Sequence, residues 1–374
     1  MRSLIAAASP AGGPLVRVGI PLTGGSLVAA ARERGYPVLF SANAFAKVYG
    51  KTHERAGDFR GFSFPDLAQF DGLNAALDSA GFVAAVKYGD YRWTVSEYYD
   101  LVASYPWAFH AAMDYCCEPE IAGDRPLRLL RMAGTAQLLA QCREEARSRG
   151  LPMPMPVIQG YRPDEYAMCA EWLPVDEWPE LVGIGSVCRR HVHGPNGILS
   201  ILEALDSVLP PHVRCHLFGV KSSALALLAN HPRVASVDSQ AWDMQARAER
   251  RTGRDMAFRI GHMEAWADRQ IDIAGRVDPG HGVQTSLFDL SQFGEIMSTE
   301  AHALECLAML YAELMLSGNI DYRDAVSWAQ RDAVTVMAII RVNGIDAESL
   351  DMLDEVFSGL AEKIAGANQQ QFFN

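Results

Sequence analysis

The sequence has little of what membrane proteins and metal-binding proteins require. No uninterrupted apolar run of about 18 residues occurs in the chain, so we expect no membrane-spanning helix. A secretory signal is not expected either, because residues 16–22 resemble a first core strand with no cleavage break. The seven cysteines include no CxxC pair and lie mostly in apolar runs, as is typical of reduced thiols. We therefore expect a cytoplasmic, globular protein without a bound metal or cofactor.

The chain also lacks an excess of positive charge. Lys and Arg total 33 against 45 Asp and Glu, which gives a formal net charge of -12 at pH 7. This balance argues against a protein that coats nucleic acid by bulk electrostatic attraction, but it is compatible with a local basic patch. Hydrophobic residues make up 49% of the 374 residues, which is enough for a large core.

Short apolar runs alternate with amphipathic segments from about residue 14 to residue 242, a spacing typical of repeated βα units. The runs are apolar on both faces, as strands of a parallel sheet are. They cover residues 15–22, 37–41, 82–88, 107–115, 155–159, 181–187, 214–220 and 234–239. Helical patterns lie between them at 26–34, 94–104, 127–149, 163–172, 197–208 and 222–230. Eight strands favour an α/β fold of the (β/α)8 TIM barrel type, with a doubly wound sheet as the alternative.

Two segments depart from this rhythm. Residues 46–80 form a polar, Gly- and Phe-containing stretch, which we interpret as an insertion and a candidate lid. After residue 242 the pattern becomes helical and rich in Arg. We expect a barrel domain over residues 1–250, with the insertion at about 46–80, and a helical C-terminal region over 251–374 that packs on the barrel.

Polar residues close several of the later strands, where the functional groups of a parallel barrel lie. Asp114 follows the fourth candidate strand, Gln159 ends the fifth, and Asp238 lies near the end of the eighth. The sixth strand ends in a turn that contains Gly183 and Gly185. Two carboxylates, an amide and glycines that permit close approach of the main chain suit a flat, polar heterocycle.

These strand ends resemble those of the tRNA-guanine transglycosylase superfamily, and more closely its DNA-modifying branch, the DpdA-like DNA-guanine transglycosylases of 7-deazapurine DNA modification. The resemblance covers about residues 15–250. Its carriers are Asp114, Ile158-Gln159-Gly160, Gly183-Ile184-Gly185, Phe218-Gly219 and Val237-Asp238-Ser239-Gln240-Ala241-Trp242. It implies base exchange by a glycosyltransferase: an aspartate attacks C1′ of a guanosine, guanine leaves, and a 7-deazaguanine such as 7-cyano-7-deazaguanine enters with retained configuration.

The resemblance also implies a role for each matched position. Asp238 would be the nucleophile, because a carboxylate can hold a covalent glycosyl intermediate. Asp114 would recognise the N–H groups of the base and Gln159 its carbonyl edge, while Gly183 and Gly185 would bring main chain close to it. Further candidates for substrate contact are Ser186, His216, Phe218, Ser41 and Asn43. The structural alternatives are that Asp238 caps a helix beginning near residue 242 and that Asp114 bonds only to backbone.

Two departures from the family pattern stand out. The family has Asp-Ser-Gly-Gly-Phe, with a second catalytic Asp as general acid and base, where we align Ser41-Ala42-Asn43-Ala44-Phe45. In this alignment that carboxylate is missing. Either Ser41 or Asn43 plays a reduced role, or an acid such as Asp114, Asp58 or Asp71 supplies proton transfer, or the chain is not a competent transglycosylase by itself. The CxCxxC and His zinc site of the tRNA enzymes is also missing after Asp238, which favours the DNA branch.

A DNA substrate requires that the target guanine be flipped out of the duplex or met in single-stranded form. The candidate contacts to the nucleic-acid backbone are Arg189, Arg190, Lys221, Arg247, Arg250, Arg251 and Arg254. Ordinary surface ion pairs with neighbouring acidic residues are the alternative for the Arg-rich helix. Besides DNA and the deazaguanine base, partner proteins of a DNA-modification system are conceivable.

Three other functions fit parts of the pattern. One is a transglycosylase or glycosidase that acts on RNA or on a free nucleoside. Another is a non-catalytic, nucleic-acid-binding subunit that kept the barrel but lost the second carboxylate. The third is a metal-dependent barrel hydrolase that uses Asp114 and His216.

Overall fold

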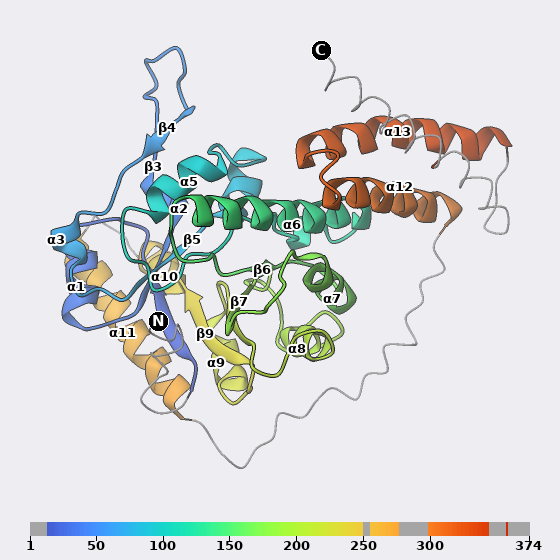
Figure 1. Ribbon diagram of the computed structural model, residues 1–374. Coiled ribbons are helices and arrows are strands. Elements are labelled where there is room, and N and C mark those ends of the chain that lie inside the picture. The colour runs from blue at the N-terminus through green and yellow to red at the C-terminus, as the bar shows by residue number, and fades with distance from the viewer. Residues whose placement is uncertain (1–12, 250–254, 277–297, 344–356, 358–374) are drawn as a thin grey trace.

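Seven parallel strands form one sheet in the computed structural model, which describes residues 13–249, 255–276, 298–343 and 357 (Figure 1). The order across the sheet is β5-β2-β1-β9-β8-β7-β6. The strands are β1 (Leu15–Gly19), β2 (Val38–Ser41), β5 (Ala75–Asp78), β6 (Val157–Ile158), β7 (Leu181–Ile184), β8 (Arg214–Leu217) and β9 (Val234–Ser239). A separate antiparallel pair consists of β3 (Ala46–Val48) and β4 (Phe59–Phe62). The predicted parallel α/β architecture is therefore confirmed.

The sheet is curled, and residues 108–112 run between its two edge strands. On the β5 side, Leu77 N donates to Phe109 O at 3.0 Å, and Ala111 N donates to Leu77 O at 2.8 Å. On the other side, Met155 exchanges both of its backbone hydrogen bonds with this segment, just ahead of β6. These contacts are isolated bridges, because too few consecutive residues pair to form a strand. Among the described residues the predicted barrel of eight regular strands is thus found only in part.

Apolar residues cover both faces of the sheet, which explains why its strands lack polar and apolar alternation. The concave face encloses a small core made of Leu39, Ala76, Phe109, Ala111, Met155, Val157 and Leu181. A much larger core lies between the convex face and the surrounding helices. The strands therefore hold their carboxyl ends, where the polar residues lie, on a rigid and fully packed support.

Helices and short helical turns connect the strands and continue beyond them (Figure 1). They are α1 (Ser26–Glu33), α2 (Ala42–Phe45), α3 (Leu67–Phe70), α4 (Gly81–Val83), the π-helix η1 (Ala84–Tyr88), α5 (Val95–Val102), the 3-10 helix η2 (Pro119–Ile121), α6 (Arg125–Ser148), α7 (Pro163–Trp172), α8 (Ile198–Asp206), α9 (Ser222–Leu228), α10 (Ala241–Glu249), α11 (Met256–Gly275), α12 (Thr299–Leu316) and α13 (Tyr322–Asn343). Side-chain caps fix several starts: Thr94 and Glu97 form a capping box at α5, and Asp124 accepts from Leu127 N at α6. None of the described helices is both long and apolar enough to cross a bilayer.

The described part of the C-terminal region is helical. Helix α11 packs against α1, β1 and α9, whereas α12 and α13 pack against the long helix α6 (Figure 1). Gln137 ties α6 to the connection between α12 and α13 by donating to Met315 O and Ile320 O, both at 2.7 Å. The division into two domains near residue 250 stays a prediction.

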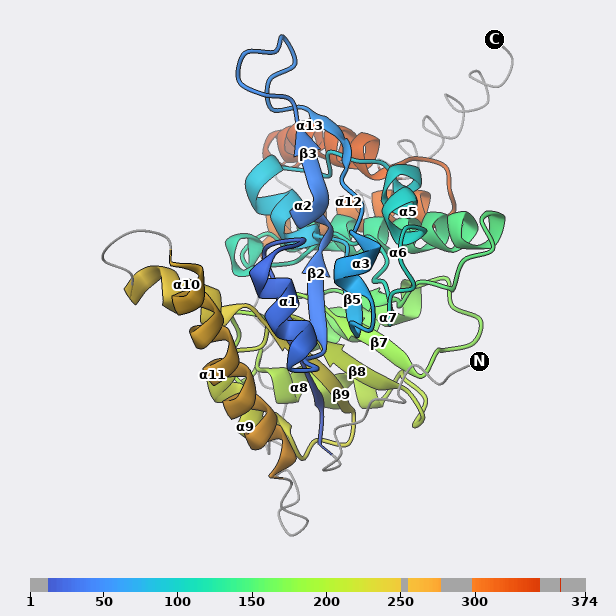
Figure 2. The ribbon, with the colours of Figure 1, turned by 90° about the vertical axis from the view of Figure 1, so that its left-hand side faces the viewer.

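Two predicted segments are assigned differently by the structure. The expected strand at 82–88 is wrong, because these residues form α4 and η1. A short apolar run does not distinguish a strand from a buried helical turn, and here Gly81 begins the helical turn. The third strand of the sheet along the chain is instead β5, which lies inside the stretch that we interpreted as an insertion. The remainder of that insertion contains the β3–β4 hairpin, which projects from the molecule in Figure 2.

Candidate active site at the carboxyl ends of the strands

Three carboxylates lie at the carboxyl ends of the parallel strands. Asp78 ends β5, Asp114 follows the segment 108–112, and Asp238 is the penultimate residue of β9. Burial raises the pKa of Asp78 to about 7, and the negative charges of Asp114 and Asp238 contribute to this rise. The three side chains therefore form one electrostatically coupled group, in which Asp78 holds a proton more readily than an ordinary aspartate.

Asp114 is buried and bonded to side chains on both of its oxygens. Its Oδ1 accepts from Ser79 Oγ at 2.8 Å and its Oδ2 accepts from Gln159 Nε2 at 2.5 Å. Burial raises the pKa of Asp114 to about 6, although these two hydrogen bonds oppose the rise. No backbone group of the described residues bonds to either oxygen, which argues against the alternative that Asp114 bonds only to backbone.

The direction of the Gln159 amide follows from its neighbours. Cys117 N donates to Ser186 Oγ at 2.7 Å, so the hydroxyl hydrogen of Ser186 is free to donate to Gln159 Oε1, also at 2.7 Å. The carbonyl of Gln159 is thereby engaged, and its NH2 group faces Asp114. This chain presents an acceptor at Asp114 and a donor at Gln159 side by side.

Glycines around this pair leave no room for a side chain. A Cβ on Gly185 would collide with Gln159 Nε2, and a Cβ on Gly81 would lie 2.7 Å from the backbone oxygen of Asp114. A Cβ on Gly183 would lie 2.6 Å from the ring of Phe218. Contacts within the chain therefore already require glycine at these positions, and the close approach of their main chain to a base stays a prediction.

Asp238 is held through one oxygen. Its Oδ1 accepts from Gly219 N at 2.9 Å, and His216 Nε2 lies 3.3 Å from the same oxygen. No described residue donates to Oδ2, which leaves that oxygen available to a substrate. The first turn of α10 is served instead by Ser239, whose Oγ accepts from Ala241 N at 3.3 Å, so the capping alternative for Asp238 is wrong.

Two buried basic side chains lie below Asp238. Burial lowers the pKa of His216, and the Asp238 carboxylate offsets this only in part, so the ring is neutral at pH 7. His216 Nδ1 pairs with Ser236 Oγ at 2.8 Å. Arg17 is buried with a pKa lowered to about 10 by burial, and it stays charged at neutral pH. The negative charge of Asp238 opposes this lowering of the Arg17 pKa.

Asp78 is a candidate for the second carboxylate that the sequence alignment lacked. It begins the run Asp78-Ser79-Ala80-Gly81-Phe82, which differs from the family pattern Asp-Ser-Gly-Gly-Phe at one residue. Ala80 occupies the position of the first glycine and adopts a left-handed φ of 72°. Residues 78–82 thus match this pattern better than residues 41–45, which we aligned with it because residues up to 80 were interpreted as an insertion.

The other acids considered for proton transfer are not part of the site. Asp58 is exposed and pairs with Arg55 in the hairpin, and Asp71 is exposed after α3. Ser41 lies beside Asp78 in the register between β2 and β5, whereas Asn43 Oδ1 accepts from Tyr88 OH at 2.9 Å. Ser41 thus lies next to Asp78, whereas Asn43 joins α2 to η1 beside the strand ends.

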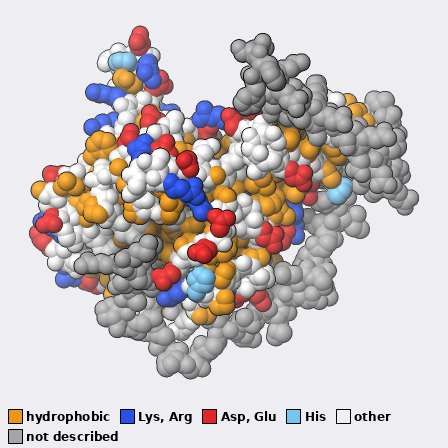
Figure 3. All heavy atoms as spheres, viewed as in Figure 1, with side chains coloured by type: hydrophobic (Ala, Val, Ile, Leu, Met, Phe, Trp, Pro, Cys, Tyr) orange, Lys and Arg blue, Asp and Glu red, His pale blue; other side chains and the backbone are white. Residues whose placement is uncertain are grey.

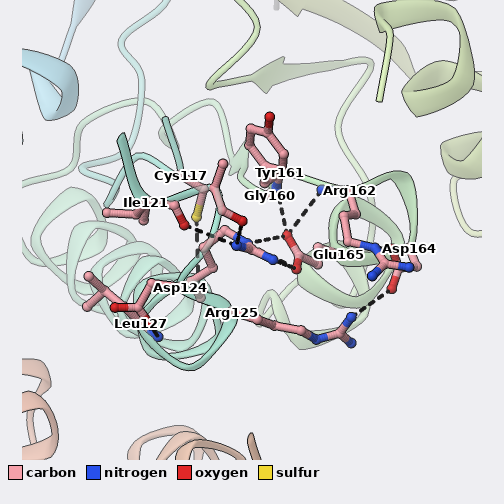
Figure 4. A network of polar contacts seen from close by, with 12 residues as sticks. Cys117, Ile121, Asp124, Arg125, Leu127, Gly160, Tyr161, Arg162, Asp164 and Glu165 are labelled. Carbon is pink, nitrogen blue, oxygen red and sulfur yellow. Dashed lines mark hydrogen bonds and ion pairs between the residues drawn. The ribbon is translucent and has the colours of Figure 1, made fainter. Parts of the chain in front are cut away.

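A buried ion pair that the sequence analysis missed involves Glu165, whose polar contacts with the loop after Gln159 are drawn in Figure 4. Arg128 of α6 and Glu165 of α7 approach to 2.7 Å, and both are almost completely buried. Glu165 also accepts from Tyr161 N, while Arg128 donates to Ile121 O at 3.0 Å. Burial alone would raise the pKa of Glu165, but its bonds to Arg128 and to backbone N–H groups lower it. The pair fixes the loops after Asp114 and Gln159 to one another.

The predicted backbone contacts differ in their surroundings. Arg189 is half exposed and pairs with Glu120 at 2.6 Å, and Lys221 Nζ donates to Arg189 O at 3.0 Å. Arg190 is buried and donates to Ser186 O and Gly160 O, which argues against contact with phosphate. Arg247 is exposed but paired with Asp243, as the ion-pair alternative expected. Arg250, Arg251 and Arg254 lie outside the described residues.

No group of three or more His, Cys, Asp and Glu side chains in the described residues could hold a metal ion. Asp78, Asp114 and Asp238 are therefore not such a group. The arrangement instead offers a free carboxylate oxygen, a second acid whose pKa is near neutrality, and a donor and acceptor pair for a planar base.

A curled parallel α/β sheet with carboxylates and an amide at its strand ends is the arrangement that we expected of a transglycosylase. A family model described as DpdA, DeoxyPurine in DNA protein A, matches residues 61–267, more than half of the chain. The chain belongs to this family, which places it in deazapurine DNA modification with DNA as substrate. Asp78, Asp114, Gln159 and Asp238 all lie within the matched region. No curated protein matches the chain.

Proposed function

We propose that this chain exchanges guanine in DNA for a 7-deazaguanine base through a covalent intermediate on Asp238. Asp238 Oδ2 attacks C1′ of the target guanosine, the bond from C1′ to N9 breaks, and guanine leaves. N9 of the incoming base then attacks C1′ and expels the carboxylate, so two inversions retain the configuration. The observation that carries the proposal is the Asp238 carboxylate, which is anchored at Oδ1 by Gly219 N and has Oδ2 free.

Asp78 would move the protons of both steps. With a pKa near 7 it can deliver its proton to the departing guanine and then, as a carboxylate, accept the N9 proton of the incoming base. Protons balance over the cycle, because Asp78 ends in the form in which it began. Asp78 also removes the main ground for a non-catalytic subunit, which was the apparent loss of this carboxylate.

Asp114 and Gln159 would select a guanine-like base. The Asp114 carboxylate can accept from the two adjacent N–H groups of such a base, and the second N–H of the Gln159 amide can donate to its carbonyl. Adenine presents a different order of donors and acceptors and would leave buried polar groups unpaired. A 7-deazaguanine keeps the recognised edge and differs from guanine at position 7.

We further infer that residues 108–112 serve as the eighth strand of a (β/α)8 barrel. They contribute hydrogen bonds to β5 on one side and to Met155 on the other, and they lead directly to Asp114. This interpretation supports the grouping of Asp78, Asp114 and Gln159, since neighbouring barrel strands end at the same mouth.

The test is exchange of labelled guanine from duplex DNA, single-stranded DNA and tRNA in the presence of 7-cyano-7-deazaguanine, followed by nucleoside mass spectrometry. Without an incoming base, intact-protein mass measurement should detect a DNA adduct that is lost in Asp238→Asn. Exchange of tRNA alone would move the chain to the RNA alternative. Binding of DNA with neither adduct nor exchange would favour the non-catalytic one.

A further inference from the structure

The β3–β4 hairpin projects from the same end of the sheet as the three carboxylates (Figures 1 and 2). It begins directly after α2, the short helix that follows the carboxyl end of β2. The hairpin covers residues 46–62 and lies almost entirely ahead of the region that the family model matches, so family membership assigns it no role.

The base of the hairpin is packed onto the substrate site. Phe59 and Phe62 contact the ring of Trp93, with centroid distances of 5.7 and 5.3 Å, and Trp93 contacts Tyr91 at 5.6 Å. Tyr91 OH in turn donates to Asp114 O at 3.0 Å. A continuous row of aromatic rings therefore connects the hairpin with the residue that would recognise the base.

Positive charge exceeds negative charge on this hairpin, although the chain as a whole is acidic: it carries Lys47, Lys51, Arg55 and Arg60 against Glu54 and Asp58. Lys47 and Lys51, two of the five lysines in the sequence, lie on it, and Lys87 lies nearby on η1. Lys47, Lys51 and Arg60 are exposed, and no described carboxylate forms an ion pair with any of them. Figure 3 shows blue Lys and Arg side chains along the projecting arm. By contrast, Arg189 and Arg247 are neutralised by acidic neighbours.

Aromatic contacts order part of this charge. Tyr49 stacks on His53 with a centroid distance of 4.3 Å, and the guanidinium groups of Arg55 and Arg60 lie 5.0 and 5.9 Å from the Tyr49 ring. Cations held over a ring lose less conformational entropy on binding than free side chains. The hairpin thus presents a partly pre-organised basic surface.

We propose that the β3–β4 hairpin binds the phosphate backbone of DNA next to the target guanosine, with Lys47, Lys51 and Arg60 as the contacts. The inference rests on the proposed function for the identity of the nucleic acid. A base that enters the strand-end site brings its own backbone to the rim, where an arm of unpaired cations neutralises phosphates and releases counterions. The hairpin thus provides local positive charge for DNA binding although the protein as a whole is acidic.

The experiment compares the full chain with the triple variant Lys47→Gln/Lys51→Gln/Arg60→Gln. Binding of fluorescently labelled duplex and single-stranded DNA is measured by anisotropy over a series of salt concentrations. Loss of three phosphate contacts should weaken binding at least about tenfold and reduce the slope of log K against log salt by about 2 to 3. The matched control is Arg147→Gln/Arg276→Gln/Arg341→Gln, which removes the same charge from exposed positions on other helices and should leave the slope unchanged.

The outcomes distinguish a failure of DNA binding by the hairpin from a failure of the proposed base exchange. An unchanged slope in the hairpin variant overturns the proposal even if the wild-type chain exchanges guanine. A reduced slope supports it even if no exchange occurs, in which case only the catalytic function fails. A change of oligomeric state in light scattering, with DNA affinity unchanged, would show that the hairpin joins two copies of the chain and would also overturn the proposal.

Discussion

At the scale of single residues, Asp78 determines how the proposed reaction should depend on pH. The leaving guanine needs a proton from Asp78, whose raised pKa of about 7 keeps it protonated below neutrality. Formation of the DNA adduct should therefore be fastest below about pH 7 and slow down as pH rises through that value. Single-turnover rates of adduct formation over a pH series measure this decrease, the alkaline limb of the pH–rate profile.

The variant Asp78→Asn keeps the size of the side chain and removes its titration. We expect adduct formation to fall about 10²- to 10⁴-fold and the limb near pH 7 to flatten. Asp176→Asn is the matched control, because Asp176 is exposed in the loop after α7, lies outside the hairpin and the strand ends, and pairs with Arg143. A limb that persists unchanged in Asp78→Asn would assign the titration to another group.

At the scale of secondary-structure elements, the buried Arg128–Glu165 pair joins α6 to α7 and contacts the loop that follows Gln159. Removing one partner leaves an uncompensated buried charge, so Arg128→Met should lower the free energy of unfolding by about 3 to 5 kcal/mol. The double variant Arg128→Met/Glu165→Leu should recover part of that loss. Urea denaturation checks both, with Arg147→Met, from an exposed pair with Glu144, expected within about 1 kcal/mol of wild type. Equal losses in the double and single variants would contradict this account.

The elements also show how far the sequence alone predicts this protein. Asp114, Gln159 and Asp238 could be placed because each follows a recognisable apolar strand. Asp78 could not, because β5 has only four residues, Ala75-Ala76-Leu77-Asp78, and follows a long polar stretch, while the apolar run after it is helical. The motif Asp-Ser-Ala-Gly-Phe is the feature of the sequence from which Asp78 could have been found. No feature of the sequence indicates the Arg128–Glu165 pair, because its partners are 37 residues apart and meet only through helix packing.

At the scale of the whole molecule, the acidic site should cost stability. In unfolded chains an aspartate has a pKa near 3.8, whereas Asp78 and Asp114 have raised values of about 7 and 6. Between these limits the folded state binds more protons than the unfolded state, so the free energy of unfolding falls as pH rises from about 4 to about 7. This contribution has the opposite sign to that of a salt-bridged aspartate.

Replacing Asp78 with Asn should therefore stabilise the protein while it impairs catalysis. At pH 8, where Asp78 is ionised in the wild type, we expect the free energy of unfolding to rise by about 1 to 3 kcal/mol, an allowance that discounts the shift for partial solvent access. At pH 4.5 the wild-type carboxyl is already protonated, so the difference should shrink towards zero. Chemical denaturation at both pH values measures it. An equal difference at both would show that Asp78 acts on stability through packing and not through its charge, and the proton-transfer role assigned to it would lose its electrostatic basis.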